Sequence, residues 1–313
     1  MGWSGSLTAN SAVGSSITFT PDTNTAGGYT VSSFKAPKKG VYRFNLNGSG
    51  GTAGRSAGGA GGSTLGYLLL DKDQTVYVGA GGTCSAAFVS SANGSSLSAI
   101  NKSNLYFVAG AGGAGGSYSS ANTYHSTAGG NGGGSSGVAG TQYKPYSNSL
   151  ILYGGGGGTQ SAGGTAGAPS TGAGQNGAAG TAGSYGTGGA GASKSKNGGT
   201  GSGGRGGDGY YGGGGGSANA SHNSGTGEKT CWGMGGGGGS GYVKNATLIV
   251  GGTTYTSITS AGIGAGSGSK GNVTVTYYAK TELPVSIDGT TIDKLIFNGV
   301  EITSLIFNGK KLF

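Results

Sequence analysis

Alternating apolar and polar residues predict β-strands in the first part of the chain. In the strand expected from Val41 to Leu46, the even-numbered residues are large and apolar, whereas Arg43 and Asn45 occupy odd-numbered positions. This period of two is typical of a strand with one buried face. Pro37 and Gly40 favour a turn before it. The same reasoning predicts strands at Ile17–Thr20, Tyr29–Phe34, Leu65–Leu70, Thr75–Gly79 and Leu105–Val108.

Two further strands are predicted after the glycine-rich middle of the chain, at Tyr242–Val250 and Asn272–Tyr278. We expect them to pair with the N-terminal strands and to close a sheet around the segment between them. No stretch shows the 3.6-residue apolar period of an amphipathic helix. The sequence therefore predicts an all-β protein.

Glycines recur at every third residue in the middle of the chain, and this spacing predicts extended threefold helices of the polyproline II type, called polyglycine II helices here. Such a helix presents one bare backbone edge, so neighbouring helices can approach closely and bond through their backbones. At about 3.1 Å per residue, Gly174 to Gly189 would extend roughly 45 Å. We expect the chain to reverse at Ser193–Asn197. The glycines in question are Gly174, Gly177, Gly180, Gly183, Gly186 and Gly189, and then Gly198, Gly201, Gly204 and Gly207.

Composition alone allows a different interpretation, in which this region is a flexible glycine and serine linker. Ordering a glycine backbone is costly, so a folded bundle has to recover much free energy. The strict spacing and the apolar stretch Leu150–Tyr153 favour an ordered region, because a linker needs neither.

The last thirty residues contain a repeat of their own, in which Leu295–Gly299 recurs as Leu305–Gly309. Each Asn-Gly pair suits a tight hairpin turn, so we expect a small β-meander. Its apolar side chains are too many for so short a module to bury, which predicts docking or self-association. The assembly candidates are Leu295, Phe297, Leu305, Phe307, Leu312 and Phe313.

These patterns divide the chain into four regions. N-terminal strands occupy residues 1–108, the glycine-rich region residues 109–241, the closing strands residues 242–281, and the hairpin repeats residues 282–313.

Composition narrows the class of protein further. Glycine accounts for 80 of 313 residues, but the five prolines exclude collagen. The start of the chain lacks the pattern of a signal peptide, and no apolar run is long enough to span a membrane. The net charge of +9 favours an anionic partner without selecting one. We expect the two distant cysteines, Cys84 and Cys231, to be unremarkable thiols.

Residues 15–279 resemble the glycine-rich domain of the anaplastic lymphoma kinase and leukocyte tyrosine kinase receptors and its bacterial relatives. The resemblance is carried by Phe34–Phe44, Val76–Gly79, Phe107–Gly110 and Gly235–Val243. It implies a jelly-roll-like sheet, similar to tumour necrosis factor, with an insertion of polyglycine helices. The kinase and transmembrane parts of those receptors have no counterpart here, so their signalling role is not implied.

Two other resemblances concern the biological setting. The paired Phe-Asn-Gly repeats before Lys310–Phe313 resemble the endings of phage and prophage tail proteins. The glycine-rich region is similar in kind to the tips of T-even-like phage adhesins, whose loops bind host receptors. Together they imply a virion protein made in the host cytoplasm, with tail proteins and a host glycan or protein receptor as partners. Fibre proteins of this kind are commonly homo-oligomers, such as trimers.

Catalytic or cofactor chemistry has little support in the sequence. His125 and His222 lie in glycine and serine surroundings without nearby carboxylates, which favours a structural role over a catalytic or metal-binding one. Residues 172–177 match the G-x-G-x-x-G pattern, but no strand precedes them and no helix follows. Asp71 and Asp73 suit a polar turn better than a calcium site. We therefore predict no enzyme activity, cofactor or metal.

Recognition by exposed aromatic side chains fits the composition better, because tyrosine offers flat, amphipathic contact area at low entropic cost. Candidates occur where the glycine spacing is interrupted. The alternative is that these aromatic residues only shield the edges of the glycine bundle. The receptor-binding candidates are Tyr118, Tyr124, His125, Tyr143, Tyr146, Tyr185, Tyr210, Tyr211 and Trp232.

Three other functions share some of these sequence features. A purely structural head-fibre or tail subunit would have the same sequence features as an adhesin. Nucleic-acid binding is suggested by the positive charge and by residues 203–207, Gly-Gly-Arg-Gly-Gly, although such motifs usually repeat. Ice binding is suggested only by the periodic threonines and glycines.

Overall fold

The computed structural model describes residues 2–21, 29–82, 84–88, 96–144, 151–169, 177–222 and 225–280, together with short strand segments after residue 284. Nearly all regular secondary structure is β, as the sequence predicts. The described helices are two short 3-10 turns, η1 (Leu97–Ala99) and η2 (Lys102–Asn104).

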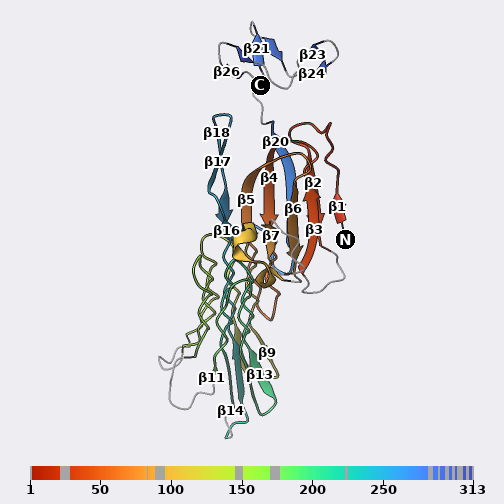
Figure 1. The fold of residues 1–313 in the computed structure, drawn as a ribbon. Helices are drawn as coiled ribbons and strands as arrows, with labels where there is room; N and C mark the ends of the chain where they lie inside the picture. Colours follow the sequence, from red (N-terminus) through yellow and green to blue (C-terminus); the bar gives the residue numbers. More distant parts are fainter. Residues whose placement is uncertain are drawn as a thin grey trace.

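Two sheets pack face to face and enclose the main hydrophobic core (Figure 1). The six-stranded sheet contains, in spatial order, β1 (Gly2–Ser4), β2 (Ser16–Thr20), β20 (Asn272–Ala279), β4 (Gly40–Asn47), β5 (Ser63–Leu70) and β19 (Ile258–Ser260). The five-stranded sheet contains β16 (Tyr242–Val243), β8 (Leu105–Ala109), β7 (Ser85–Phe88), β6 (Thr75–Gly81) and β3 (Tyr29–Lys35).

Alternation places the large side chains of these sheets in the core. Phe44 of the six-stranded sheet meets Phe34 and Phe107 of the five-stranded sheet, with ring centroids 6.1 and 6.2 Å apart. All three rings are at most 3% exposed. The closing strand β20 pairs with both β2 and β4, which confirms the expected closure by a C-terminal strand.

One predicted strand is wrong. Tyr242–Val250 divides into β16, which pairs with β8, and β17 (Thr247–Val250), which pairs with β18 (Thr253–Thr256) in a separate hairpin. Val243 still packs against the core, whereas residues 244–247 are exposed, so the chain leaves the sheet at that point.

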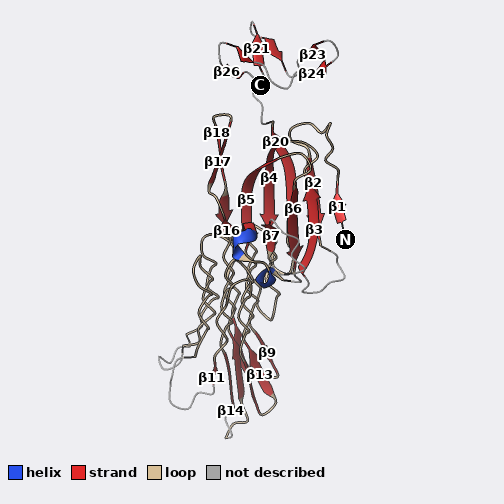
Figure 2. Ribbon diagram, in the orientation of Figure 1, coloured by secondary structure: helices blue, strands red, loops and turns tan. Residues whose placement is uncertain are grey.

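The glycine-rich segments form a bundle that extends from one end of the two packed sheets (Figure 1). Figure 2 shows that most of the bundle is neither helix nor strand. Two small sheets lie toward its far end. The three-stranded distal sheet contains β12 (Ser193–Lys196), β13 (Gly199–Ser202) and β9 (Ser117–Ser119), and the four-stranded distal sheet contains β10 (Thr123–Ser126), β15 (Lys229–Gly233), β14 (Ala218–His222) and β11 (Gly177–Ala178).

Backbone hydrogen bonds hold the bundle together. Every N–H from Met234 to Gly241 donates a hydrogen bond, and every carbonyl from Gly233 to Ser240 accepts one. All residues of this segment are buried. Its partners come from six surrounding stretches, which are residues 111–114, 127–133, 134–138, 155–158, 204–210 and 211–217. Residues 233–241 are therefore a core made of backbone.

Residues 211–217 form a second core segment of the same kind. They exchange hydrogen bonds with residues 153–156, 164–167, 181–184, 189–192, 204–207 and 234–240. Both core segments contain five consecutive glycines. A methyl group on Gly213 would come within 3.0 Å of the Gly237 carbonyl oxygen, closer than real Cβ atoms approach other heavy atoms. A segment that other backbones surround on all sides therefore needs glycine at each position that faces a neighbour.

Two of the triplet-spaced glycines, Gly180 and Gly183, lie at the periphery, whereas Gly204 and Gly207 donate to the core carbonyls of Met234 and Gly237. Gly180 and Gly183 donate to the carbonyls of residues 167 and 164, while Thr181 and Ala182 between them are exposed. The predicted uninterrupted helix from Gly174 to Gly189 is wrong, because the chain reverses at residues 184–187, where Gly186 has a φ of +71°. Gly174 lies outside the described residues.

The predicted reversal after Ser193 is confirmed. β12 and β13 form a hairpin, and the connecting Asn197 and Gly198 have φ values of +48° and +81°. Both positive angles suit a tight two-residue turn. Residues 48–62 also belong to the bundle by their hydrogen bonds, although their sequence position is among the N-terminal strands.

In the C-terminal repeats the described strands form three antiparallel pairs. These pairs are β21 (Val285–Ile287) with β22 (Thr290–Ile292), β23 (Ile296–Phe297) with β24 (Val300–Glu301), and β25 (Ile306–Phe307) with β26 (Lys310–Lys311). In the described part of this region the pairs belong to separate two-stranded sheets and do not form the predicted β-meander. Of the assembly candidates, Phe297 and Phe307 lie on these strands, whereas Leu295, Leu305, Leu312 and Phe313 lie outside the described residues.

Candidate surface-binding site

Five of the aromatic candidates gather on the two distal sheets, and we call them the distal aromatic cluster: Tyr118, Tyr124, His125, Tyr143 and Trp232. Strands β9, β10 and β15 carry four of them, and Tyr143 bridges to Leu152 beside the four-stranded distal sheet. The structure thus brings together residues that are up to 114 positions apart in the sequence.

The exposed part of this cluster is a stacked pair of tyrosines. The rings of Tyr118 and Tyr124 have centroids 4.4 Å apart and planes 14° apart. Tyr124 is 55% exposed, and Tyr118 is half-buried. The guanidinium carbon of Arg55 lies 5.4 Å from the Tyr118 ring centroid, a cation–π contact. This pair offers a flat aromatic surface beside a positive charge.

The other three members pack on the opposite face of the four-stranded distal sheet. His125 stacks on Tyr143 with ring centroids 3.7 Å apart, and Tyr143 meets Trp232 edge to face at 5.8 Å. Tyr143 and Trp232 also cover the buried side chains of Leu152 and Met234. These three rings therefore have a packing role, as expected if the aromatic residues shield the edges of the glycine bundle.

Positive charge collects around the stacked tyrosines. Lys194 pairs across β13 with Gly201, which in turn pairs with Tyr118, so the lysine and the tyrosine share a face of the three-stranded distal sheet. Lys196 follows on the same strand, and Lys229 on β15 reaches the turn at Gly198, with Nζ 3.6 Å from the position of an added Cβ.

These lysines are not neutralised. Among the described residues, none of the three forms an ion pair. Glu228 is the single acidic residue within residues 117–126, 193–202 and 218–233. The distal end is therefore a positively charged surface that carries the exposed Tyr124 and the half-buried Tyr118.

Tyr185, Tyr210 and Tyr211 lie elsewhere, where the bundle meets the five-stranded sheet. Tyr185 donates its hydroxyl to the carbonyl of Ile100 at 2.6 Å, and burial raises the pKa of this phenol. Lys102 lies 4.6 Å from the Tyr185 ring centroid and donates to the Tyr211 hydroxyl at 2.7 Å. These tyrosines join the bundle to the sheet.

The remaining candidates are placed as follows. Tyr146 lies outside the described residues, as do the side chain of His222 and residues 172–176 of the G-x-G-x-x-G match. Asp71 and Asp73 make exposed ion pairs with Lys39 and Lys35. Cys84 and Cys231 are buried thiols, and burial raises the pKa of Cys231.

Sequence reasoning missed the basic residues of the distal surface, because lysines scattered along a chain carry no sign that they will meet. For Arg55, however, the sequence does contain a signal that its segment belongs to the glycine bundle. Gly48, Gly51 and Gly54 precede it at three-residue spacing, the same spacing that identified the later glycine segments.

In the part of the chain that the structure describes, no group of three or more potential metal-binding His, Cys, Asp or Glu residues occurs. No described helix is long and apolar enough to cross a bilayer.

In comparisons with known proteins, no protein-family model matches the chain, and no curated protein shows significant sequence similarity to it.

Proposed function

We propose that this chain is a bacteriophage virion protein, associated with the tail as a fibre, tip or baseplate component, that contacts the host surface through the distal end of its glycine-rich bundle. The proposal assigns it no catalytic activity. It is supported by the resemblance of the C-terminal repeats to phage tail proteins and by the distal surface described above.

The finer fold belongs to the same proposal. We take the two packed sheets to be a jelly roll, and the glycine segments to be polyglycine II helices. Support for the helices comes from hydrogen bonds that recur at three-residue steps toward one neighbour. Met234, Gly237 and Ser240, for example, donate in turn to the carbonyls of Ser217, Gly214 and Tyr211. A threefold helix requires this repeat.

The observation that carries the function is the partly exposed Tyr118–Tyr124 stack, near lysines that form no ion pair among the described residues. Flat aromatic rings pack against sugar rings and other planar groups, and positive charge attracts anionic polymers. Phage host surfaces present such polymers in teichoic acids and lipopolysaccharide. An anionic surface glycan is therefore the receptor class that this surface fits best.

Cell binding tests the proposal. Purified protein should decorate cells of the host strain and block phage adsorption, and the double substitution Tyr118→Ala and Tyr124→Ala should remove both effects. Tyr153→Ala is the matched control, because this tyrosine is 42% exposed elsewhere on the bundle and its backbone, not its side chain, makes its hydrogen bonds within the described chain. If the unmodified protein neither decorates cells nor blocks adsorption, the purely structural head-fibre or tail role is favoured instead.

Nucleic-acid binding is the other candidate for a positive surface. The structure gives less support to its sequence motif, residues 203–207, because the Arg205 guanidinium already forms an ion pair with Asp208 at 2.6 Å. Binding to single-stranded RNA that weakens steeply with salt, and that competes with host-cell binding, would favour this alternative.

Assembly follows from the same proposal. We propose that the C-terminal hairpins attach the chain to other tail proteins, and that the protein acts as a homo-oligomer in the virion.

A further inference from the structure

The bundle has one open position in its hydrogen-bonded packing. Residues 110–116 lie deep in the bundle, yet they have neighbours on five sides where the two core segments have six. The five neighbouring stretches are residues 49–52, 55–62, 127–132, 205–208 and 236–239. The open side lies between residues 49–52 and residues 205–208, because each of the other adjacent pairs of stretches is joined by its own hydrogen bonds.

A cavity occupies this open side. It has a volume of about 320 Å³, and residues 50–52, 111–114 and 205–208 contribute most of its lining. We call it the lattice groove. Its walls are largely glycine and alanine, including Gly51, Gly112 and Gly207. Bare backbone, rather than side chains, therefore faces any molecule that enters.

Polar backbone groups toward the groove have no partner. Gly112 donates its N–H to the Ser49 carbonyl, but within the described chain its own carbonyl accepts no hydrogen bond. Likewise, the backbone N–H groups of Thr52, Arg205 and Asp208 donate no hydrogen bond within the described chain. Arg205 and Asp208 are three residues apart, the step at which neighbouring segments bond elsewhere in the bundle.

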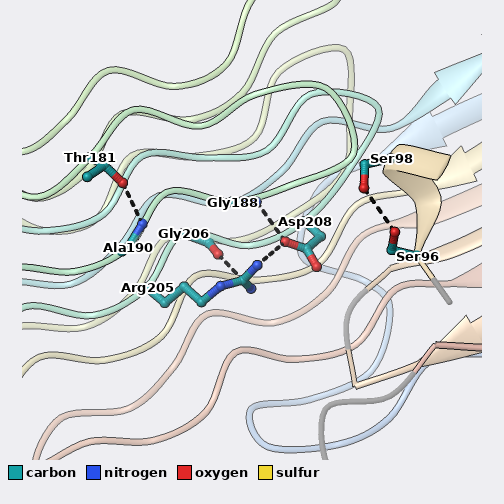
Figure 3. A network of polar contacts seen from close by, with 8 residues as sticks. All are labelled: Ser96, Ser98, Thr181, Gly188, Ala190, Arg205, Gly206 and Asp208. Carbon is teal, nitrogen blue, oxygen red and sulfur yellow. Dashed lines mark hydrogen bonds and ion pairs between the residues drawn. The ribbon is translucent and has the colours of Figure 1, made fainter.

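Side-chain charge in the groove is already compensated, as Figure 3 shows. The Arg205 guanidinium donates to Asp208 Oδ1 at 2.6 Å, and the same oxygen accepts the Gly188 N–H at 2.7 Å. Asp208 is 7% exposed. An entering molecule meets a neutral pair, so a charged ligand gains little here, whereas a neutral backbone can pair with the open N–H and carbonyl groups.

We propose that the lattice groove binds an extended glycine-rich segment of a partner polypeptide, which completes the sixth side of residues 110–116. The guest accepts from Arg205 and Asp208 at three-residue spacing and donates to Gly112. It carries glycine wherever it faces the walls, because a side chain there would collide as it would inside the bundle. This inference does not depend on the adhesive role.

A second copy of this chain is a poorer guest. Its two core glycine segments are already bonded on all sides within their own bundle, so donating either would require that bundle to open. A segment from a different polypeptide has no such cost. The glycine-rich guest is therefore assigned to a partner protein.

A peptide-binding experiment on the full chain tests this. The probe is a neutral, end-capped, fluorescent peptide of Gly-Gly-Ser repeats, and the control peptide has Val at the second position of each repeat. We expect saturable binding of the glycine peptide alone. Ala114→Leu, which places a larger side chain in the groove, should weaken it at least about tenfold, the effect of losing one good hydrogen bond or more. Ala182→Leu, at an exposed site on the periphery, should not weaken it.

A second variant covers the case in which Ala114→Leu fails to fold. Thr52→Pro removes one N–H donor of the groove, and the fixed φ of proline suits an extended threefold segment. It should also weaken peptide binding. Absence of saturable binding to the unmodified chain, or equal binding to the Ala114→Leu variant, overturns the proposal. Self-association of the chain that Ala114→Leu abolishes would overturn the partner assignment in favour of a second copy.

Discussion

Adding a single methyl group at Gly213 should push the two backbone core segments apart. Gly213 lies in residues 211–217, facing residues 233–241, and a Cβ at this position would collide with the carbonyl oxygen of Gly237. Both segments are buried and bonded on all sides. In the variant Gly213→Ala, neither segment can move away without breaking hydrogen bonds to the other. The expected result is a large loss of stability from the smallest possible side chain.

The magnitude follows from the bonds at this contact. Met234, Gly237 and Ser240 donate across it to residues 217, 214 and 211, each at 2.9 Å. At about 1 kcal/mol for each net hydrogen bond, losing these three costs roughly 3 kcal/mol. Replacing glycine by alanine also lowers the entropy of the unfolded chain, which offsets about 0.4–1 kcal/mol. We therefore expect Gly213→Ala to lower the free energy of unfolding by about 2–3 kcal/mol.

Chemical denaturation followed by circular dichroism measures this change through the midpoint and slope of unfolding. Gly266→Ala is the control, because Gly266 is exposed and an added Cβ would meet no heavy atom within 4 Å. The control should leave stability unchanged or slightly raised. If Gly213→Ala behaved like Gly266→Ala, direct backbone packing between the two core segments would be refuted.

Two further predictions concern buried polar groups. Asp208→Ala should lower the free energy of unfolding by about 1–3 kcal/mol, because it leaves the buried Gly188 N–H unpaired. The control Asp71→Ala removes an exposed ion pair and should cost less than about 1 kcal/mol. Equal losses of stability in denaturant titrations of the two variants would contradict this prediction. Burial raises the pKa of Tyr185 above its ordinary value of 10.0, so folding favours the neutral phenol, and this contribution is present below pH 10 and lost as the pH rises further. Melting temperatures at rising alkaline pH should therefore fall less steeply in Tyr185→Phe than in the unmodified chain, and parallel curves would count against the assignment.

The sandwich of two sheets could be predicted well from the sequence, because its strands bury side chains. β4 and β20 show the alternation that burial on one face requires, and both lie within a residue or two of their predicted bounds. β16 and β17 could not be separated, since Tyr242–Val250 is apolar enough for one strand and only the packing of Val243 decides where the chain leaves the sheet.

The glycine bundle was predictable in principle but not in its arrangement. Three-residue spacing occurs at the periphery, as at Gly180 and Gly183, and also beside the core, where Gly204 and Gly207 donate to the carbonyls of Met234 and Gly237. A segment surrounded by others needs glycine at every position, and the runs at 212–216 and 235–239 therefore show no period at all. Neither pattern alone places a segment, because the five-glycine run at 154–158 is only partly buried.

The candidate site was predictable only as a list of residue types. Tyr118 and Tyr124 stood out as aromatic residues that interrupt the glycine spacing, but so did Tyr185, which joins the bundle to the five-stranded sheet. Nothing local in the sequence distinguishes these two environments. Each environment depends on which segments contact one another, and backbone hydrogen bonds between residues distant in the sequence determine these contacts.

Amide hydrogen exchange along the chain is the most direct test of a core built from backbone. The amides of residues 212–216 and 234–240 are buried and donate hydrogen bonds on every side, so they should exchange as slowly as those of β4 in the centre of the six-stranded sheet. Exposed connections such as residues 225–228 should exchange fast. Fast exchange throughout both glycine runs, with β4 still protected, would contradict the account.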